Sequence, residues 1–187
     1  MTSTRPSMRL SSVLLMAMLI CAFMTHRLHA EAYYVRASGN NGSSGAHPDE
    51  AWRTIGYALD RLAPGDVLYI GAGTYEEELV LAASGAEDEP IEIVGDVDGA
   101  ATGDAGEVLL LGDRRTQRLW LLDQVEHVEI RGFTIRGGKS RGIEIFQSSD
   151  VVIRDCIVEE MTRKHHSDGV WIRGSDVEII GCTIRNV

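Results

Sequence analysis

The 187-residue sequence predicts an all-β chain whose short strands stack as the coils of a parallel solenoid. Three segments align without a gap from Val128, Val151 and Val177, at separations of 23 and 26 residues. Apolar residues alternate within each segment, which is the periodicity of a β-strand. Strands this short cannot bury their inner faces alone, whereas successive coils stacked on one another can.

Each repeat consists of a short strand, a two-residue bend and a second short strand, and shorter copies begin at Val67 and Ile91. The bend holds glycine or aspartate, the residues that best adopt a positive φ. These bend residues are Gly71, Gly95, Gly132, Asp155 and Gly181. A further strand precedes the last three repeats, and its copies start at Arg118, Gly142 and Gly169.

Stacking the repeats predicts interior ladders of similar side chains. The predicted ladders are Val128/Val151/Val177, Ile130/Ile153/Ile179, Phe133/Cys156/Cys182 and Ile135/Val158/Ile184. A shared interior ladder favours packed free thiols at Cys156 and Cys182, and a disulfide between them stays open for an exported protein.

One segment, residues 49–66, has a helical pattern. Asp49 is the expected N-cap and Pro64-Gly65 the stop. Its expected apolar face consists of Trp52, Ile55, Leu59 and Leu62. Because this helix precedes the first coil, we expect it to cap the solenoid and cover its open edge.

The first residues have the features of a signal peptide. Arg5 and Arg9 precede an apolar run at residues 11–24, and Ala30-Glu31-Ala32 supplies a small-x-small cleavage site. The run is shorter than the roughly 20 residues that a membrane-spanning helix needs. We therefore expect a signal peptide at 1–32 and a secreted or periplasmic protein without a membrane anchor after its removal. The remaining chain divides into a capping region at 33–66 and coils at 67–187.

The chain is acidic, with a formal net charge of −10. Leaving out Arg5, Arg9, Arg27 and Glu31 makes the net charge −12. Such a chain is a poor general binder of nucleic acid, and it binds acidic polysaccharides only where basic residues cluster. The sequence contains no phosphate-cradling loop, nucleophile elbow or nucleotide-binding fingerprint. We expect a monomer that binds no nucleic acid.

The segments "YYVRASGNNGSSG" and "AWRTIGYALDRLAPGDVLYIGAGTYEEELVL" carry a family resemblance. Their opening strand, Gly/Asn/Ser loop, helix, PGD and GTY-E turn resemble the N-terminal part of secreted proteins of the pectate-lyase-like superfamily. The resemblance implies a right-handed parallel β-helix with three short strands in each coil. It is specific for the fold and weak for the reaction, because one architecture hosts several activities.

By this resemblance, the loops "GGKSR" and "EEMTRKHHSD" lead into the first sheet of successive coils. Their basic and titratable residues are then expected to gather along one edge of the solenoid. These residues are Arg136, Lys139, Arg141, Arg163, Lys164, His165 and His166. Two interpretations stay open: a solvated polar turn, or a cationic strip that binds an acidic sugar polymer.

In the same sheet, alternation is expected to turn Trp120, Glu144 and Trp171 outward. The two tryptophans would then lie about 10 Å apart along the axis and form a stacking surface for a glycan. The alternatives are that a flanking loop covers them or that the register slips by one residue. We expect Arg163 and His166 to contribute to the same binding surface.

The resemblance also implies a chemistry. In the related lyases a base removes the proton α to a uronate carboxylate, which Ca²⁺ or cationic side chains neutralise. Here Lys139, Arg141, Lys164 and His165 are the candidates for base or cation. Glu144 and Asp168 are candidate Ca²⁺ ligands. The family's cluster of aspartates on successive coils is not complete in this sequence.

These observations predict a secreted enzyme that acts on acidic polysaccharide, with β-elimination as the first reaction to test. A glycan hydrolase or a uronate epimerase on the same scaffold is the alternative enzyme. A non-catalytic adhesin or carbohydrate-binding module is the alternative from another class. The sequence ends directly after a third-sheet strand without a cap, so we expect it to be the N-terminal portion of a longer protein.

Overall fold

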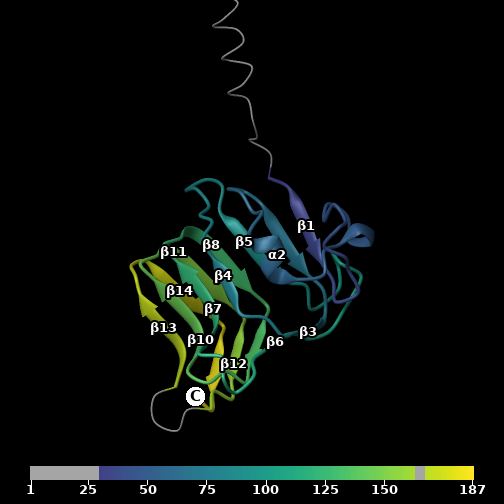
Figure 1. Cartoon of the computed structure of the whole chain (residues 1–187). Helices are drawn as coiled ribbons and strands as arrows, with labels where there is room; N and C mark the ends of the chain where they lie inside the picture. Colours follow the sequence, from purple (N-terminus) through teal and green to yellow (C-terminus); the bar gives the residue numbers. More distant parts are fainter. Residues whose placement is uncertain (1–29, 163–166) are drawn as a thin grey trace, which may run out of the picture.

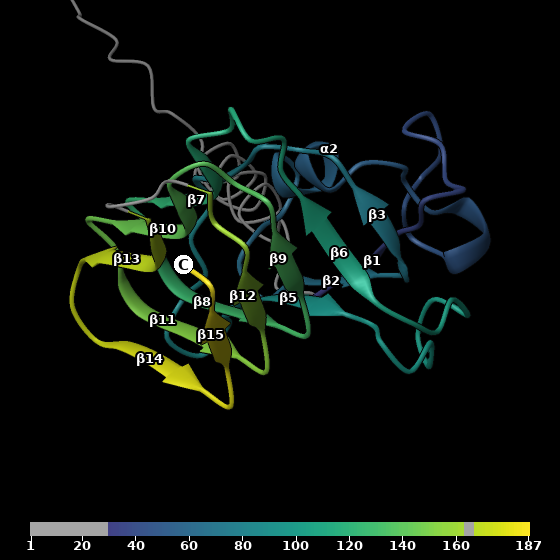
Figure 2. The same cartoon turned by 90° about the horizontal axis from the view of Figure 1, so that it is seen from below.

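The computed structural model describes residues 30–162 and 167–187. Within them, parallel strands form three sheets that surround a single hydrophobic core. The coils stack along one axis from β1 to the C-terminal strands (Figure 1). Viewed from below, the sheets form the sides of each coil (Figure 2). The predicted all-β solenoid with three short strands in each coil is therefore confirmed.

The six-stranded sheet contains, in spatial order, β1 (Ala32–Val35), β2 (Val67–Ile70), β5 (Ile91–Gly95), β8 (Glu126–Arg131), β11 (Ser149–Arg154) and β14 (Val177–Ile180). The five-stranded sheet contains β3 (Gly73–Tyr75), β6 (Val108–Leu111), β9 (Thr134–Arg136), β12 (Ile157–Glu159) and β15 (Thr183–Arg185). The four-stranded sheet contains β4 (Leu79–Leu81), β7 (Arg118–Asp123), β10 (Arg141–Phe146) and β13 (Asp168–Arg173).

The strand register confirms the interior ladders of the first two sheets. The paired sets are Val128/Val151/Val177, Ile130/Ile153/Ile179 and Ile135/Val158/Ile184. In the last coil Ile179 and Ile184 are exposed, because nothing in the described residues covers that end of the stack. Among the described residues, no helix is long and apolar enough to cross a membrane.

The two cysteines share the predicted interior position and are free thiols. The backbone N–H of Cys156 donates to Sγ of Cys182 over 3.4 Å. Burial raises the pKa of the Cys156 thiol to about 12, so this thiol stays protonated and unreactive at neutral pH.

The expected bend geometry holds in the three gap-free repeats. Gly132, Asp155 and Gly181 have φ values of 78°, 50° and 64°. Gly71 and Gly95 are not among the residues with positive φ. After Gly95, an inserted loop at residues 96–107 replaces the two-residue bend, so the tight geometry is not required there.

The predicted helix is shorter than its sequence pattern. It consists of the 3-10 turn η1 (Pro48–Glu50) and the helix α2 (Ile55–Leu59), whose N-cap is Thr54 rather than Asp49. The intervening chain is extended because Trp52 exchanges backbone hydrogen bonds with residues at the end of β1. The helix still caps the stack: α2 packs against β4, the edge strand of the four-stranded sheet.

A side chain from the first coil completes the N-terminus of α2. The two carboxylate oxygens of Glu77 accept hydrogen bonds from the backbone N–H groups of Ile55 and Gly56, each at 2.9 Å. Thr54 itself makes no side-chain cap. The carboxylate therefore satisfies two of the free N–H groups at the positive end of the helix.

The expected outward position of Trp120 is wrong. Arg118 pairs with Arg141 rather than with Gly142, so Trp120 lies beside Ile143 in the interior. Its side chain is 0% exposed and meets the ring of Phe133 edge-on, with ring centroids 5.1 Å apart. The one-residue slip moves Trp120 into the core and leaves Trp171 outside, so the expected pair of surface tryptophans does not exist.

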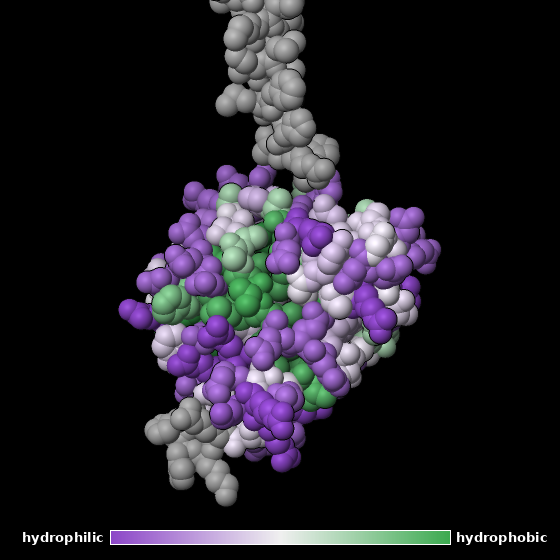
Figure 3. Space-filling view, in the orientation of Figure 1, coloured by the Kyte–Doolittle hydropathy of each residue, from purple (hydrophilic) through white to green (hydrophobic). Residues whose placement is uncertain are grey.

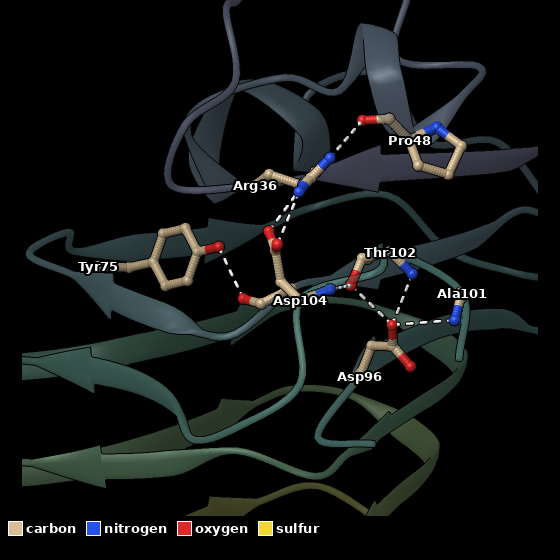
Figure 4. Close-up of polar contacts among 8 residues, drawn as sticks. Arg36, Pro48, Tyr75, Asp96, Ala101, Thr102 and Asp104 are labelled. Atoms are coloured by element: carbon tan, nitrogen blue, oxygen red, sulfur yellow. Dashed lines mark hydrogen bonds and ion pairs between the residues drawn. The ribbon is translucent and has the colours of Figure 1, made fainter. Parts of the chain in front are cut away.

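An ion pair fastens the inserted loop to the start of the chain (Figure 4). Nε and Nη2 of Arg36 each lie 2.6 Å from a carboxylate oxygen of Asp104. Nη1 of Arg36 donates to the carbonyl oxygen of Pro48 over 3.4 Å. The hydrogen bonds from Arg36 hold the pKa of Asp104 below its ordinary value. The fork therefore joins three separate segments around the first coil.

A buried carboxylate shapes the same loop from within. Oδ2 of Asp96 accepts three hydrogen bonds, from the backbone N–H groups of Ala101 and Thr102 and from the hydroxyl of Thr102 (Figure 4). Burial opposes ionisation of this group, but the hydrogen bonds from Thr102 and Ala101 bring the pKa of Asp96 below its ordinary value.

We predict that Asp104→Asn destabilises the protein by about 1–3 kcal/mol at pH 7, because it removes a charge-assisted pair. Since the pKa of Asp104 is lowered in the folded state, this contribution is complete above roughly pH 4 and declines as the pH falls further. Urea unfolding at pH 7 and pH 3 measures the difference. The exposed Asp88→Asn is the control, and an equal Asp104→Asn effect at both pH values would contradict the prediction.

We predict that Trp120→Ala costs about 3–5 kcal/mol of unfolding free energy, because it empties a filled interior position. Trp120→Phe should cost much less, since the indole Nε1 is buried without a hydrogen-bond partner and its loss removes that penalty. Trp171→Ala, on the outer face, is the matched control. Denaturant unfolding of the three variants checks this, and similar costs for Trp120→Ala and Trp171→Ala would refute the register.

Candidate functional site

The connections that lead into the four-stranded sheet stack on one another, as expected. The backbone N–H of Lys139 donates to the carbonyl of Thr116 over 2.7 Å. In the next coil, the N–H of Asp168 donates to the carbonyl of Ser140 over 2.8 Å. These bonds hold the starts of β7, β10 and β13 in line, so their polar side chains meet at one edge of the sheet.

Two arginines converge on one carboxylate at this edge. Glu144 is only 7% exposed although it lies on the outer face of β10. Nη1 of Arg141 lies 2.8 Å from Oε1 of Glu144, and Nη1 of Arg118 lies 3.6 Å from Oε2. Between them is a pocket of about 190 Å³, lined also by Gln117 and Ser140. The carboxylate thus fixes both guanidinium groups beside an open hollow.

Trp171 and Asp168 complete the site from the next coil. Trp171 pairs with Glu144 in the strand register, and the guanidinium of Arg141 lies 4.2 Å from the centroid of its ring. Nε of Arg141 lies 4.0 Å from Oδ2 of Asp168. Arg141 is therefore the centre of the cluster, because it contacts a carboxylate on either side and an aromatic face.

The remaining expected residues separate into three groups. Lys139 lies in the connection directly before the cluster, where its backbone is fixed by Thr116. Arg136 does not join the cationic strip: it faces outward from β9 and pairs with Glu159 at 2.7 Å and Glu107 at 3.3 Å. The residues outside the described ranges are Arg163, Lys164, His165 and His166.

Three arginines escaped the sequence prediction. Arg114, Arg115 and Arg118 belong to "DRRTQR", which occupies the same inter-coil position as "GGKSR" one coil earlier. This repeated placement was the signal that could have found them. Asp113 shapes the turn by accepting hydrogen bonds from the backbone N–H groups of Arg115 and Thr116, which leaves Arg114 and Arg115 exposed.

The described residues do not fit a calcium centre. Glu144 and Asp168 both contact Arg141, so a cation already stands between the two expected ligands. Within residues 30–162 and 167–187, no group of three or more His, Cys, Asp or Glu side chains gathers closely enough to hold a metal ion. Ca²⁺ also prefers six to eight oxygen ligands. Its requirement stays a prediction from the resemblance.

Further along the same edge, toward the capping helix, the charge reverses. A hollow of about 460 Å³ is lined by Glu76, Glu77, Glu78 and Asp113. Over β4 and α2 the surface is apolar and is surrounded by hydrophilic residues (Figure 3), and Val80 of β4 is 49% exposed. The edge thus passes from an acidic hollow beside an apolar area to the arginine cluster.

Comparison with known proteins identifies the architecture. The family model described as "Right handed beta helix region" matches residues 121–187. No curated protein sequence matches the chain significantly.

Solved structures extend the likeness over most of the chain. The GH136 lacto-N-biosidase from Eubacterium ramulus has a TM-score of 0.68 at 15% identity, covering 94% of this chain and 37% of that chain. The pectate lyase Pel9A has a TM-score of 0.61 at 15% identity, covering 81% of this chain and 47% of that chain. The chain therefore spans less than half the length of either protein. The protein has the fold of a right-handed parallel β-helix.

Proposed function

We propose that this chain belongs to an exported β-helix protein that binds an acidic polysaccharide along the edge of the four-stranded sheet and cleaves it by β-elimination. The convergence of Arg118 and Arg141 on the pocket beside Glu144 carries the proposal. A planar guanidinium matches the geometry of a carboxylate, so two of them beside a hollow favour an anionic sugar.

The local charge supports an anionic ligand against the charge of the whole chain. The pocket lining contains two guanidinium groups, Arg118 and Arg141, and one carboxylate, Glu144. Asp168 pairs with Arg141 from outside that lining, at 4.0 Å. Arg114 and Arg115 are exposed in the preceding connection. A positive cluster on an acidic protein concentrates anionic ligand at one place rather than over the whole surface.

Trp171 supports a sugar polymer rather than a small anion. Its ring lies one coil beyond Glu144 on the outer face of the same sheet, and Arg141 covers part of that ring. Adjacent strands lie about 4.8 Å apart, so one sugar residue can contact the pocket while its neighbour reaches the ring. A guanidinium group on one coil and an aromatic ring on the next suit an extended chain of acidic sugars.

The chemistry of β-elimination needs two contributions. The proton α to the uronate carboxylate becomes acidic enough only when the developing negative charge is stabilised, and a base must then remove it. Arg118 and Arg141 would supply the stabilising charge. Lys139 is the described candidate for the base, and Lys164 and His165 are further candidates from the sequence. Two solved structures with a similar fold are those of a pectate lyase and a lacto-N-biosidase, and this likeness supports a carbohydrate ligand.

We predict that Arg141→Gln lowers the unfolding free energy by about 1–3 kcal/mol, because it leaves the buried Glu144 with a single, more distant partner. The double variant Arg141→Gln/Glu144→Gln should recover most of the loss, since two neutral amides need no counter-ion. Thermal or urea unfolding of the cycle measures the coupling. If the double variant is as unstable as the sum of the single variants, Glu144 does not anchor the arginines.

We predict that the protein produced from its complete gene generates unsaturated uronate, followed by absorbance, from at least one of pectate, alginate and chondroitin. Arg118→Gln and Arg141→Gln should each lower kcat/KM by about 10–100-fold, the loss of one charge-assisted contact. Arg154→Gln, an ion-paired arginine on the outer face of the six-stranded sheet, is the matched control. Melting temperatures establish that each variant is folded.

The outcomes separate the alternatives. Activity that survives both arginine variants would move the chemistry elsewhere in the protein. Polysaccharide binding that needs the arginines, without any unsaturated product, would support a binding module. New reducing ends without unsaturated product would support a hydrolase. Activity that EDTA abolishes and Ca²⁺ restores would establish the metal requirement.

A further inference from the structure

A buried carboxylate near the beginning of the fold holds the chain at Glu31. Asp66, the residue before β2, is 4% exposed. Its Oδ2 accepts a hydrogen bond from the backbone N–H of Ala63 at 2.8 Å, and its Oδ1 accepts one from the backbone N–H of Glu31 at 3.1 Å. A buried carboxylate is costly without a positive partner, and both of these donors are neutral amides.

Residues 31 and 32 are part of the folded structure. The carbonyl of Glu31 accepts a hydrogen bond from the N–H of Val67 at 2.9 Å. The hydroxyl of Tyr33 donates to the Glu31 carboxylate at 2.7 Å. Ala32 is the first residue of β1 and pairs with Val67. The six-stranded sheet therefore begins before Tyr33, at residues that the sequence prediction placed in the signal peptide.

Two peptide bonds compete as the end of the export signal, because a small residue, Ala30 or Ala32, directly precedes each of them. The full small-x-small pattern belongs to the cut after Ala32, whereas Leu28 stands two residues before Ala30. A chain that began at Tyr33 would lack the N–H that Asp66 accepts and the carbonyl to which Val67 donates. Leaving such groups without partners is destabilising. A chain that began at Glu31 would keep every one of these contacts.

We infer that signal peptidase hydrolyses the Ala30–Glu31 bond and that the new ammonium group of Glu31 becomes the ionic partner of Asp66. Water adds to the carbonyl carbon of Ala30, the C–N bond breaks, and the nitrogen of Glu31 leaves as an amine that is protonated at neutral pH. The same nitrogen already lies 3.1 Å from Oδ1 of Asp66. Cleavage therefore converts a neutral hydrogen bond into a charge-assisted one.

The surroundings have room for a charged terminus. Asp66 borders a hollow of about 510 Å³, and Tyr33, Arg61 and Glu89 also line it. The lining of this hollow therefore contains two carboxylates, Asp66 and Glu89, and one guanidinium group, that of Arg61. The inference rests on the proposed export of the protein and is independent of the polysaccharide chemistry.

N-terminal sequencing and intact mass of the exported protein test the site directly. The full chain is expressed with its own first residues in a secreting bacterial host, and we expect the product to begin at Glu31. A product that begins at Tyr33 would overturn the inference and leave export standing. A product that keeps Met1 would overturn both. Ala32→Leu places a bulky residue directly before the competing Ala32–Tyr33 bond only. The variant should therefore still be cut at the Ala30–Glu31 bond. A loss of cleavage in this variant would also overturn the inference.

Melting temperatures test the ion pair separately. Asp66→Asn is compared in two chains, one beginning at Glu31 and one that keeps Ala30, in which the Glu31 nitrogen is an amide. We expect the fall in melting temperature to be larger by roughly 2–4 °C in the chain that begins at Glu31. Asp60→Asn, at an exposed position, should give the same small change in both. Equal effects of Asp66→Asn in the two chains would refute the ion pair.

Discussion

In-register pairing between successive coils is the constraint on which the rest of the structure depends. Because side chains alternate between the two faces of a strand, the register decides at once what is buried and what is presented to solvent. It places Val151 between Val128 and Val177 in the interior. On the neighbouring sheet it places Glu144 beside Trp171 on the outside and Trp120 in the core. Core and candidate site are therefore consequences of one alignment.

The same constraint explains how far the sequence could predict the fold. The ladder from Val128 was predictable because its repeats align without a gap and end in the same tight bend. In the four-stranded sheet, "RLWLL" and "GIEIF" alternate in either of two registers, and the sequence pattern cannot choose between them. The connections that precede these strands set the register, because the backbone N–H of Lys139 donates a hydrogen bond to the carbonyl of Thr116 in the preceding coil. The helix was overestimated because backbone bonds to β1 hold Trp52 in an extended segment, against its helical pattern.

The candidate site was only partly predictable for the same reason. The sequence indicated that basic residues enter the four-stranded sheet, and Arg141 and Glu144 do meet there. Arg118 joins them only in the observed register, where it pairs with Arg141. That pairing also changes the role of Glu144, from an expected metal ligand to the anchor of two guanidinium groups. Arg136 was misplaced because it pairs with Glu159, its direct neighbour across the five-stranded sheet, and so lies away from the edge of the four-stranded sheet.

The contact between Glu77 and α2 also fixes an order of events during folding. A helix of five residues is far too short to persist alone in water. Its first N–H groups depend on a carboxylate 22 residues further along the chain, beyond β2 and β3. The helix can therefore settle only when the first coil has closed. Until then the edge of β4 lacks the helix that packs against it, and an uncovered strand edge can pair with another chain.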